Sequence, residues 1–171
     1  MSKHFILTYL PLLLTNVLHM WMVKWDWLSP LKIPVNERLF GKNKTWRGIF
    51  LVAILNLLFF SAVALAFGYW NELSPEAPVL GLSLGLAYSL SELPNSFLKR
   101  RLGIAPGQKS GPGLSWSVFS DRADSALGVC WVYCWMMNLD VTTGAILFFP
   151  ALLVHLFFSA VLVALKVKEQ I

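Results

Sequence analysis

Charged residues are scarce in this chain. They make up 13% of its 171 residues, about half the fraction expected of a soluble globular domain. Hydrophobic residues make up 57% and gather in long runs. No segment alternates between apolar and polar residues well enough to predict a strand. This balance excludes an ordinary soluble domain and predicts an all-α integral membrane protein, with one transmembrane domain covering residues 1–171.

Cysteine is also scarce, since Cys130 and Cys134 are the only two. They lie four residues apart within an apolar run, and a helix cannot bring such a pair into disulfide geometry. We therefore interpret them as small packing residues rather than a redox or metal site. The apolar run Phe5–Val23 lacks a following small-residue cleavage site, which favours a retained helix over a removed signal.

Five apolar segments predict about five transmembrane helices. The segments are His4–Val23, Gly48–Trp70, Pro78–Leu93, Ser125–Met137 and Thr142–Lys166. A bilayer core of about 30 Å needs about 20 helical residues, so the second and fifth segments are long enough and the third and fourth are short. We expect polar helix ends to enter the membrane at the short segments, with the fourth helix beginning near Asp121.

The basic residues are distributed unevenly around these segments. In a five-helix arrangement, 13 of the 14 Lys and Arg residues fall on one side, and only Lys3 falls on the other. Because basic loops stay on the cytoplasmic side, the N-terminus is expected outside and the C-terminus in the cytoplasm, in an inner or plasma membrane. The basic residues lie in short loops rather than along one soluble face. Lipid headgroups or phosphates are therefore expected partners, and nucleic acid is not.

Three polar clusters share the predicted cytoplasmic face. They are Gly41–Gly48, Glu92 with Ser96–Arg101, and Asp121–Ser125. Carboxylates are hard oxygen ligands suited to Mg²⁺ or Mn²⁺, and Lys and Arg neutralise phosphate charge. Together the clusters predict a metal-dependent phosphate reaction on this face.

The carboxylates of the third cluster allow two interpretations. Asp121 and Asp124 share one helix face at a spacing of three residues, so both can address one metal ion. Alternatively, Asp121 caps the fourth helix and Asp124 stabilises its positive end. Glu92 favours the metal interpretation, because a carboxylate at the end of an apolar segment is costly unless it is paired or bound to metal.

Other polar residues also have structural interpretations. His19 and His155 lie in apolar context, which favours a structural hydrogen bond or an interfacial position over catalysis. For the basic triplet Lys99–Arg101 the alternative interpretation is cytoplasmic anchoring charge without a role in binding or catalysis.

These polar residues resemble the signatures of the membrane-embedded CTP-dependent cytidylyltransferases. Ser96–Arg100 followed by Asp121–Ser125 looks like the S-x-x-K-R and D-R-x-D-S motifs of phosphatidate cytidylyltransferase. Gly41–Gly48 and Lys99–Gly103 are similar to CDP-archaeol synthase, likewise a small five-helix protein. Where the family usually has Gly-Asp, this chain has Ser91-Glu92.

The resemblance implies transfer of a cytidylyl group from CTP to a membrane lipid phosphate, giving a CDP-lipid and pyrophosphate. It implies metal ligation by Glu92, Asp121 and Asp124, with both aspartates also catalytic. The basic residues implied to be catalytic are Lys99, Arg100 and Arg122. The residues implied to bind substrate are Asn43, Lys44, Thr45, Arg47, Ser96 and Arg101.

Two other functions stay open. A CTP-dependent lipid-alcohol kinase would use similar phosphate-binding residues but release CDP. A non-catalytic membrane protein derived from the family would bind anionic lipid or a partner, and the Ser91-Glu92 departure is its main support. The lipid tails are not determined, and the resemblance leaves a homodimer open.

Overall fold

The computed structural model describes residues 1–73, 75–105 and 114–164. Side chains are described for most of these residues but not for 114–122, 155, 156, 158–160 and 162–164, so the interpretation of His155 lies outside the described residues. The five long helices are α1 (Ser2–Lys24), α3 (Trp46–Ala66), α5 (Ala77–Arg101), α6 (Leu114–Met136) and α7 (Val141–Ala164). The short ones are η1 (Ser29–Leu31), α2 (Glu37–Phe40) and α4 (Trp70–Leu73). Within the described ranges there is no strand, and each predicted apolar segment forms a helix, so the all-α prediction is confirmed there.

Helices α1 and α3 are long and apolar enough to cross a bilayer. Only 28% and 44% of their most apolar stretches are buried inside the molecule, unlike the core helix of a soluble protein. On α3, Phe50, Ile54 and Leu58 form an exposed stripe at helical spacing. These features indicate a membrane protein. The number of spans and their orientation stay predictions.

Four long helices end at a residue in the left-handed conformation. These residues are Asp26, Gly68, Gly103 and Asn138, with φ between 49° and 74°. After α5, for example, the Ile104 N–H donates to the Lys99 carbonyl over 3.0 Å. Glycine adopts this conformation without steric cost and Asn and Asp tolerate it, so the sequence itself places these helix ends.

One predicted helix start is wrong, because α6 begins at Leu114, well before Asp121. Helix α5 extends beyond the apolar segment Pro78–Leu93 and continues through Pro94 to Arg101. Pro94 cannot donate to the Leu90 carbonyl, yet the helix resumes beyond it. Apolar composition indicates where a chain meets lipid, whereas helical hydrogen bonding extends into polar residues with adequate helix propensity.

The core takes a large buried residue from each long helix. Leu7, Phe60, Leu84, Tyr133 and Leu147 come from α1, α3, α5, α6 and α7 in that order, and each is at most 1% exposed. Cys130 is also buried and both cysteines are free, which agrees with the prediction that they are packing residues.

Glycines let α3 and α5 pack closely. A Cβ on Gly81 would stand 2.7 Å from the Phe60 Cβ, and one on Gly85 would stand 2.7 Å from the Val52 carbonyl oxygen. Between them the Asn56 amide donates to the Gly81 carbonyl over 2.7 Å. Small residues and a buried polar bond of this kind are typical of helix contacts in membranes.

The same kind of contact joins α5 to α6, because a Cβ on Gly128 would stand 2.6 Å from the Ser91 Oγ.

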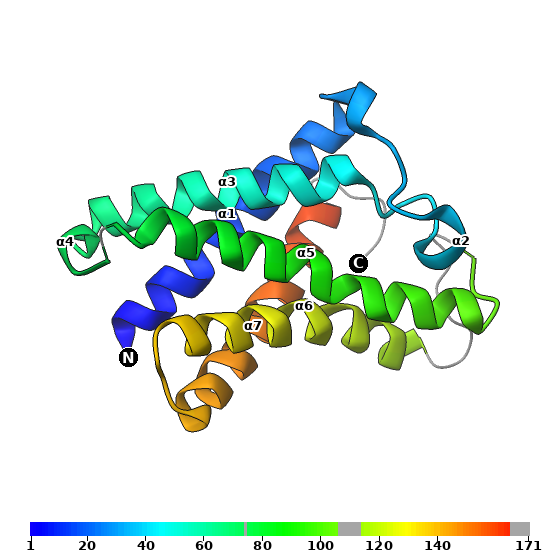
Figure 1. The fold of residues 1–171 in the computed structure, drawn as a ribbon. Coiled ribbons are helices and arrows are strands. Elements are labelled where there is room, and N and C mark those ends of the chain that lie inside the picture. The colour runs from blue at the N-terminus through cyan, green and yellow to red at the C-terminus, as the bar shows by residue number, and fades with distance from the viewer. Residues whose placement is uncertain (74, 106–113, 165–171) are drawn as a thin grey trace.

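The bundle has two distinct ends (Figure 1). The C-terminal ends of α1 and α5 and the N-terminal ends of α3 and α6 form what we call the polar end. The start of α1, helix α4 and the connection from α6 to α7 form the opposite end.

Candidate functional site

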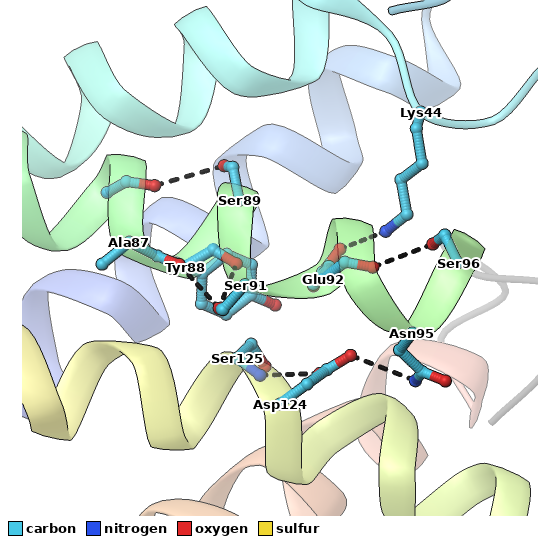
Figure 2. A network of polar contacts seen from close by, with 11 residues as sticks. Lys44, Ala87, Tyr88, Ser89, Ser91, Glu92, Asn95, Ser96, Asp124 and Ser125 are labelled. Atoms are coloured by element: carbon cyan, nitrogen blue, oxygen red, sulfur yellow. Dashed lines mark hydrogen bonds and ion pairs between the residues drawn. The ribbon is translucent and has the colours of Figure 1, made fainter. Parts of the chain in front are cut away.

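The centre of the polar end is an ion pair between the Lys44 ammonium and the Glu92 carboxylate (Figure 2). Lys44 precedes α3 and Glu92 lies on α5. Their side chains are 27% and 23% exposed, so the pair is accessible but mostly enclosed. Two predicted site residues from different clusters are thus brought into contact.

Asp124 enters the same network from α6. The Asn95 amide on α5 donates to Asp124 Oδ2 over 3.1 Å, and the Ser125 N–H donates to Asp124 Oδ1 over 2.6 Å. Glu92 and Lys44 both interact electrostatically with Asp124. Figure 2 shows Asp124 below α5, facing Asn95, while Lys44 reaches Glu92 from above. Facing helices therefore bring two carboxylates and one cation together.

The position of Asp124 removes one of the two interpretations of its cluster. Because α6 begins at Leu114, Asp121 and Asp124 lie within the helix and cannot cap its N-terminus. Asp121 therefore does not cap α6, and Asp124 lies beyond the first turn, where a carboxylate would stabilise the positive end of the helix. The side chains of Asp121 and Arg122 lie outside the described residues, so their predicted roles stay predictions.

Arg47 is clasped at the start of α3. Its side chain is only 4% exposed, and its Nη1 donates to Asp26 Oδ1 over 2.8 Å and to the Trp27 carbonyl over 3.0 Å. Hydrogen bonds from Arg47 and then Lys32 hold the pKa of Asp26 below its ordinary value. The buried Arg47 Nε has no hydrogen-bond partner within the described part of the chain.

The chain entering α3 is fixed by backbone bonds. The Val35 N–H donates to the Lys44 carbonyl over 2.8 Å, and the Trp46 N–H donates to the Ile33 carbonyl over 2.9 Å. Thr45 caps the helix, since its Oγ1 accepts from the Gly48 N–H over 3.2 Å. Asn43 lies exposed in the turn before Lys44. Lys44 is therefore presented from an ordered segment.

The basic triplet occupies the last turn of α5. Ser96 Oγ donates to the Glu92 carbonyl over 2.9 Å, and the Arg101 guanidinium lies 5.0 Å from the centre of the Phe97 ring. Lys99 is half-buried. Arg100 Nε and Nη1 are buried and find no acceptor in the described ranges. Buried N–H groups without acceptors are costly, and a phosphate oxygen would satisfy them.

The donor set fits a magnesium ion without forming a complete protein cage. Among the described residues no group of three or more His, Cys, Asp or Glu residues could hold a metal. The two carboxylates Glu92 and Asp124 do match Mg²⁺, which usually takes one or two carboxylates with substrate phosphates and water. Metal binding stays a prediction.

Sequence reasoning missed three residues of the polar end. Asn95 stands three residues after Glu92 on α5, a spacing that signals a shared face once the helix is known to pass Pro94. Asp26 is one of only two acids between Lys24 and Arg47, which suggests a partner for a cation. His19 was interpreted as a structural hydrogen-bonding or interfacial residue, and its buried Nε2 has no partner among the described residues.

Comparison with known proteins gives a partial match. The chain is 33% identical over 70 residues to a CDP-archaeol synthase of Staphylothermus marinus. The alignment covers 41% of this chain and 37% of that protein, so the chain spans little more than a third of this relative's length. No family model and no solved structure matches the chain. The similarity supports, over part of the chain, the resemblance carried by the polar motifs.

Proposed function

We propose that this protein is a membrane-embedded, Mg²⁺-dependent cytidylyltransferase that acts on a lipid phosphate. The convergence of Glu92 and Asp124 from facing helices beside Lys44 carries the proposal. Two carboxylates and a cation meet the needs of nucleotide phosphates, whose transfer depends mostly on positioning and charge neutralisation. The name of the partly matching relative supports the same reaction class.

In this proposal a lipid phosphate oxygen forms a bond to the α-phosphorus of CTP, and the bond from that phosphorus to pyrophosphate breaks. The products are a CDP-lipid and pyrophosphate. Glu92, Asp124 and Asp121 would hold Mg²⁺, which would neutralise charge developing on the phosphates. Lys99, Arg100 and Arg122 brace the triphosphate.

The remaining predicted residues divide by position. Lys44 and Arg47 lie at the start of α3, where the lipid phosphate would approach, with Asn43 and Thr45 beside them. Ser96 and Arg101 lie on the last turns of α5. Thr45 Oγ1 accepts one local bond and Ser96 Oγ donates another, so the Thr45 hydroxyl can still donate to a substrate oxygen and the Ser96 oxygen can still accept.

Purified protein incubated with labelled CTP, Mg²⁺ and a panel of lipid phosphates tests the proposal. The panel contains phosphatidate and an isoprenoid-ether glycerol phosphate. We expect a labelled CDP-lipid and an equal amount of pyrophosphate, and no product in excess chelator. Release of CDP with a phosphorylated lipid alcohol would replace the proposal with a kinase, and CTP binding without turnover of any lipid would replace it with a non-catalytic protein.

We further propose five spans with the N-terminus outside and the polar end in the cytoplasm, where CTP is available. The distribution of basic residues supports this orientation. Reporter fusions after Gln170 and at Asn71 test it. The first is expected in the cytoplasm and the second outside, and the reverse result would place the polar end away from CTP.

A further inference from the structure

His19 lies near the C-terminal end of α1 with a buried Nε2 that has no hydrogen-bond partner within the described residues. Its ring faces the first turn of α3, because a Cβ on Gly48 would stand 3.8 Å from His19 Nε2 and 3.7 Å from Thr45 Oγ1. A buried nitrogen without a partner is costly to the folded state, so its retention in this position calls for a ligand.

The surroundings of His19 indicate the chemistry of that ligand. Lys44, Arg47 and Glu92 all interact electrostatically with the imidazole. Glu92 is paired with Lys44, and Asp26 pairs with Arg47 through Nη1. Arg47 Nε, which can only donate, is buried and unpartnered in the same described region. His19 Nε2 and Arg47 Nε are therefore two buried nitrogens without described partners, and an anion with several oxygen atoms would supply acceptors for both.

We propose that His19 Nε2 donates a hydrogen bond to a phosphate oxygen of a substrate held beside Lys44 and the first turn of α3. This inference rests on the proposed function and deepens it, since it adds a binding residue from α1. Such an oxygen comes either from the lipid phosphate or from CTP. Donation to an anionic oxygen is stronger than a neutral hydrogen bond, so its loss has a measurable effect on affinity.

Two substitutions separate binding from structure. His19→Leu removes the nitrogen and keeps an apolar side chain, and His19→Gln retains a donor near the position of Nε2. Because Nε2 has no described partner in the protein, His19→Leu is expected to leave the melting temperature unchanged or raise it. His4→Leu on the same helix is the matched control. His4 Nδ1 is bonded to the Tyr133 hydroxyl over 2.9 Å at the opposite end, so this change should lower the melting temperature without altering ligand affinity.

The experiment measures dissociation constants of the purified protein for single ligands, so that no turnover is needed. The ligands are CTP, a short-chain phosphatidate, a short-chain isoprenoid-ether glycerol phosphate, and diacylglycerol as the uncharged control. We expect His19→Leu to weaken one phosphate ligand about tenfold, His19→Gln to retain most of the affinity, and diacylglycerol to show no difference. A loss confined to a lipid phosphate identifies the lipid as the source of the oxygen, and one confined to CTP identifies the nucleotide.

Unchanged affinity of folded His19→Leu for every phosphate ligand would overturn the inference, as would a wild-type protein that binds none of them. A lower melting temperature for His19→Leu with wild-type affinity would return His19 to a structural role. The proposed function fails separately. Phosphate binding that depends on His19, without formation of a CDP-lipid, would uphold this inference and refute the transferase.

Discussion

The two ends of the bundle both carry charged and polar side chains, but these side chains differ in how many find hydrogen-bond partners among the described residues. At the opposite end Lys3 pairs with Glu72, His4 with Tyr133, and Asp140 accepts bonds from Thr143. The four buried side-chain nitrogens that lack partners in the described structure belong to His19, Arg47 and Arg100, all at the polar end. The contacts at the opposite end are satisfied within the fold, whereas the polar end has buried donors for which the described residues supply no acceptor.

The largest expected effect comes from Asp124→Asn at the polar end. The substitution keeps the size of the side chain and an acceptor for Asn95 but removes the charge that a hard cation needs. A lost electrostatic contact of ~3 to 4 kcal/mol in the transition state corresponds to roughly a hundredfold to a thousandfold loss of turnover. The rate of CDP-lipid formation measures it.

Asp140→Asn is the matched control, because Asp140 is exposed at the opposite end. Its turnover should stay close to wild type. Near-normal turnover and metal dependence of Asp124→Asn would remove Asp124 from the metal site, while equal losses in both variants would indicate general damage.

A smaller effect is expected from Asn95→Ala, which removes the amide bonded to Asp124 Oδ2. Asn95 acts through Asp124, so it is a positioning residue. Loss of about 1 kcal/mol should raise the Mg²⁺ concentration needed for half-maximal activity about fivefold. Asn71→Ala, an exposed change on α4, should leave that concentration unchanged. If Asn95→Ala needed no more Mg²⁺ than the wild type, the positioning role would be excluded.

These predictions depend on features that the sequence revealed unequally. The five apolar segments were sufficient to predict the helices, because long apolar runs have few other stable forms in a membrane. The clusters around Lys44, Glu92 and Asp124 were also visible, since charges next to apolar segments need a reason. The contact between Lys44 and Glu92 could not be predicted from the sequence, because it depends on how α3 and α5 pack around Gly81 and Gly85.

The contribution of Asn95 was hidden by Pro94. Proline usually ends a helix, so the sequence alone does not predict that Glu92 and Asn95 share a helix face. His19 was hidden for another reason. A lone histidine in an apolar helix usually finds a partner within the protein, and only the packed structure shows that its Nε2 has none among the described residues.

At the opposite end, Tyr133→Phe is expected to change stability and not turnover. The hydroxyl is fully buried and bonded to His4, so its removal should cost about 1 kcal/mol, or about 2 to 4 °C in melting temperature. Thermal unfolding in detergent measures the shift. A large loss of turnover at temperatures where the variant stays folded would show that the opposite end also takes part in catalysis.

The smallest effect concerns Asp26, whose carboxylate lies in water on one side and against Arg47 on the other. Its pKa is lowered by hydrogen bonds from Arg47 and Lys32, so the folded state favours the ionised form. The resulting stabilisation is fully present above the unfolded-state pKa of about 3.9 and is lost as pH falls through the lower folded-state pKa.

Asp26→Asn keeps an acceptor for Arg47 but cannot ionise. The melting temperature of the wild type should therefore exceed that of the variant slightly at pH 7, and the difference should shrink as pH falls below about 4. High salt should reduce it further, because the Asp26 side chain is half exposed. A difference that stays constant from pH 7 to pH 3 would mean that the charge of Asp26 does not stabilise the folded state. The bond from Arg47 to the Trp27 carbonyl would then be sufficient to hold the Arg47 side chain in place.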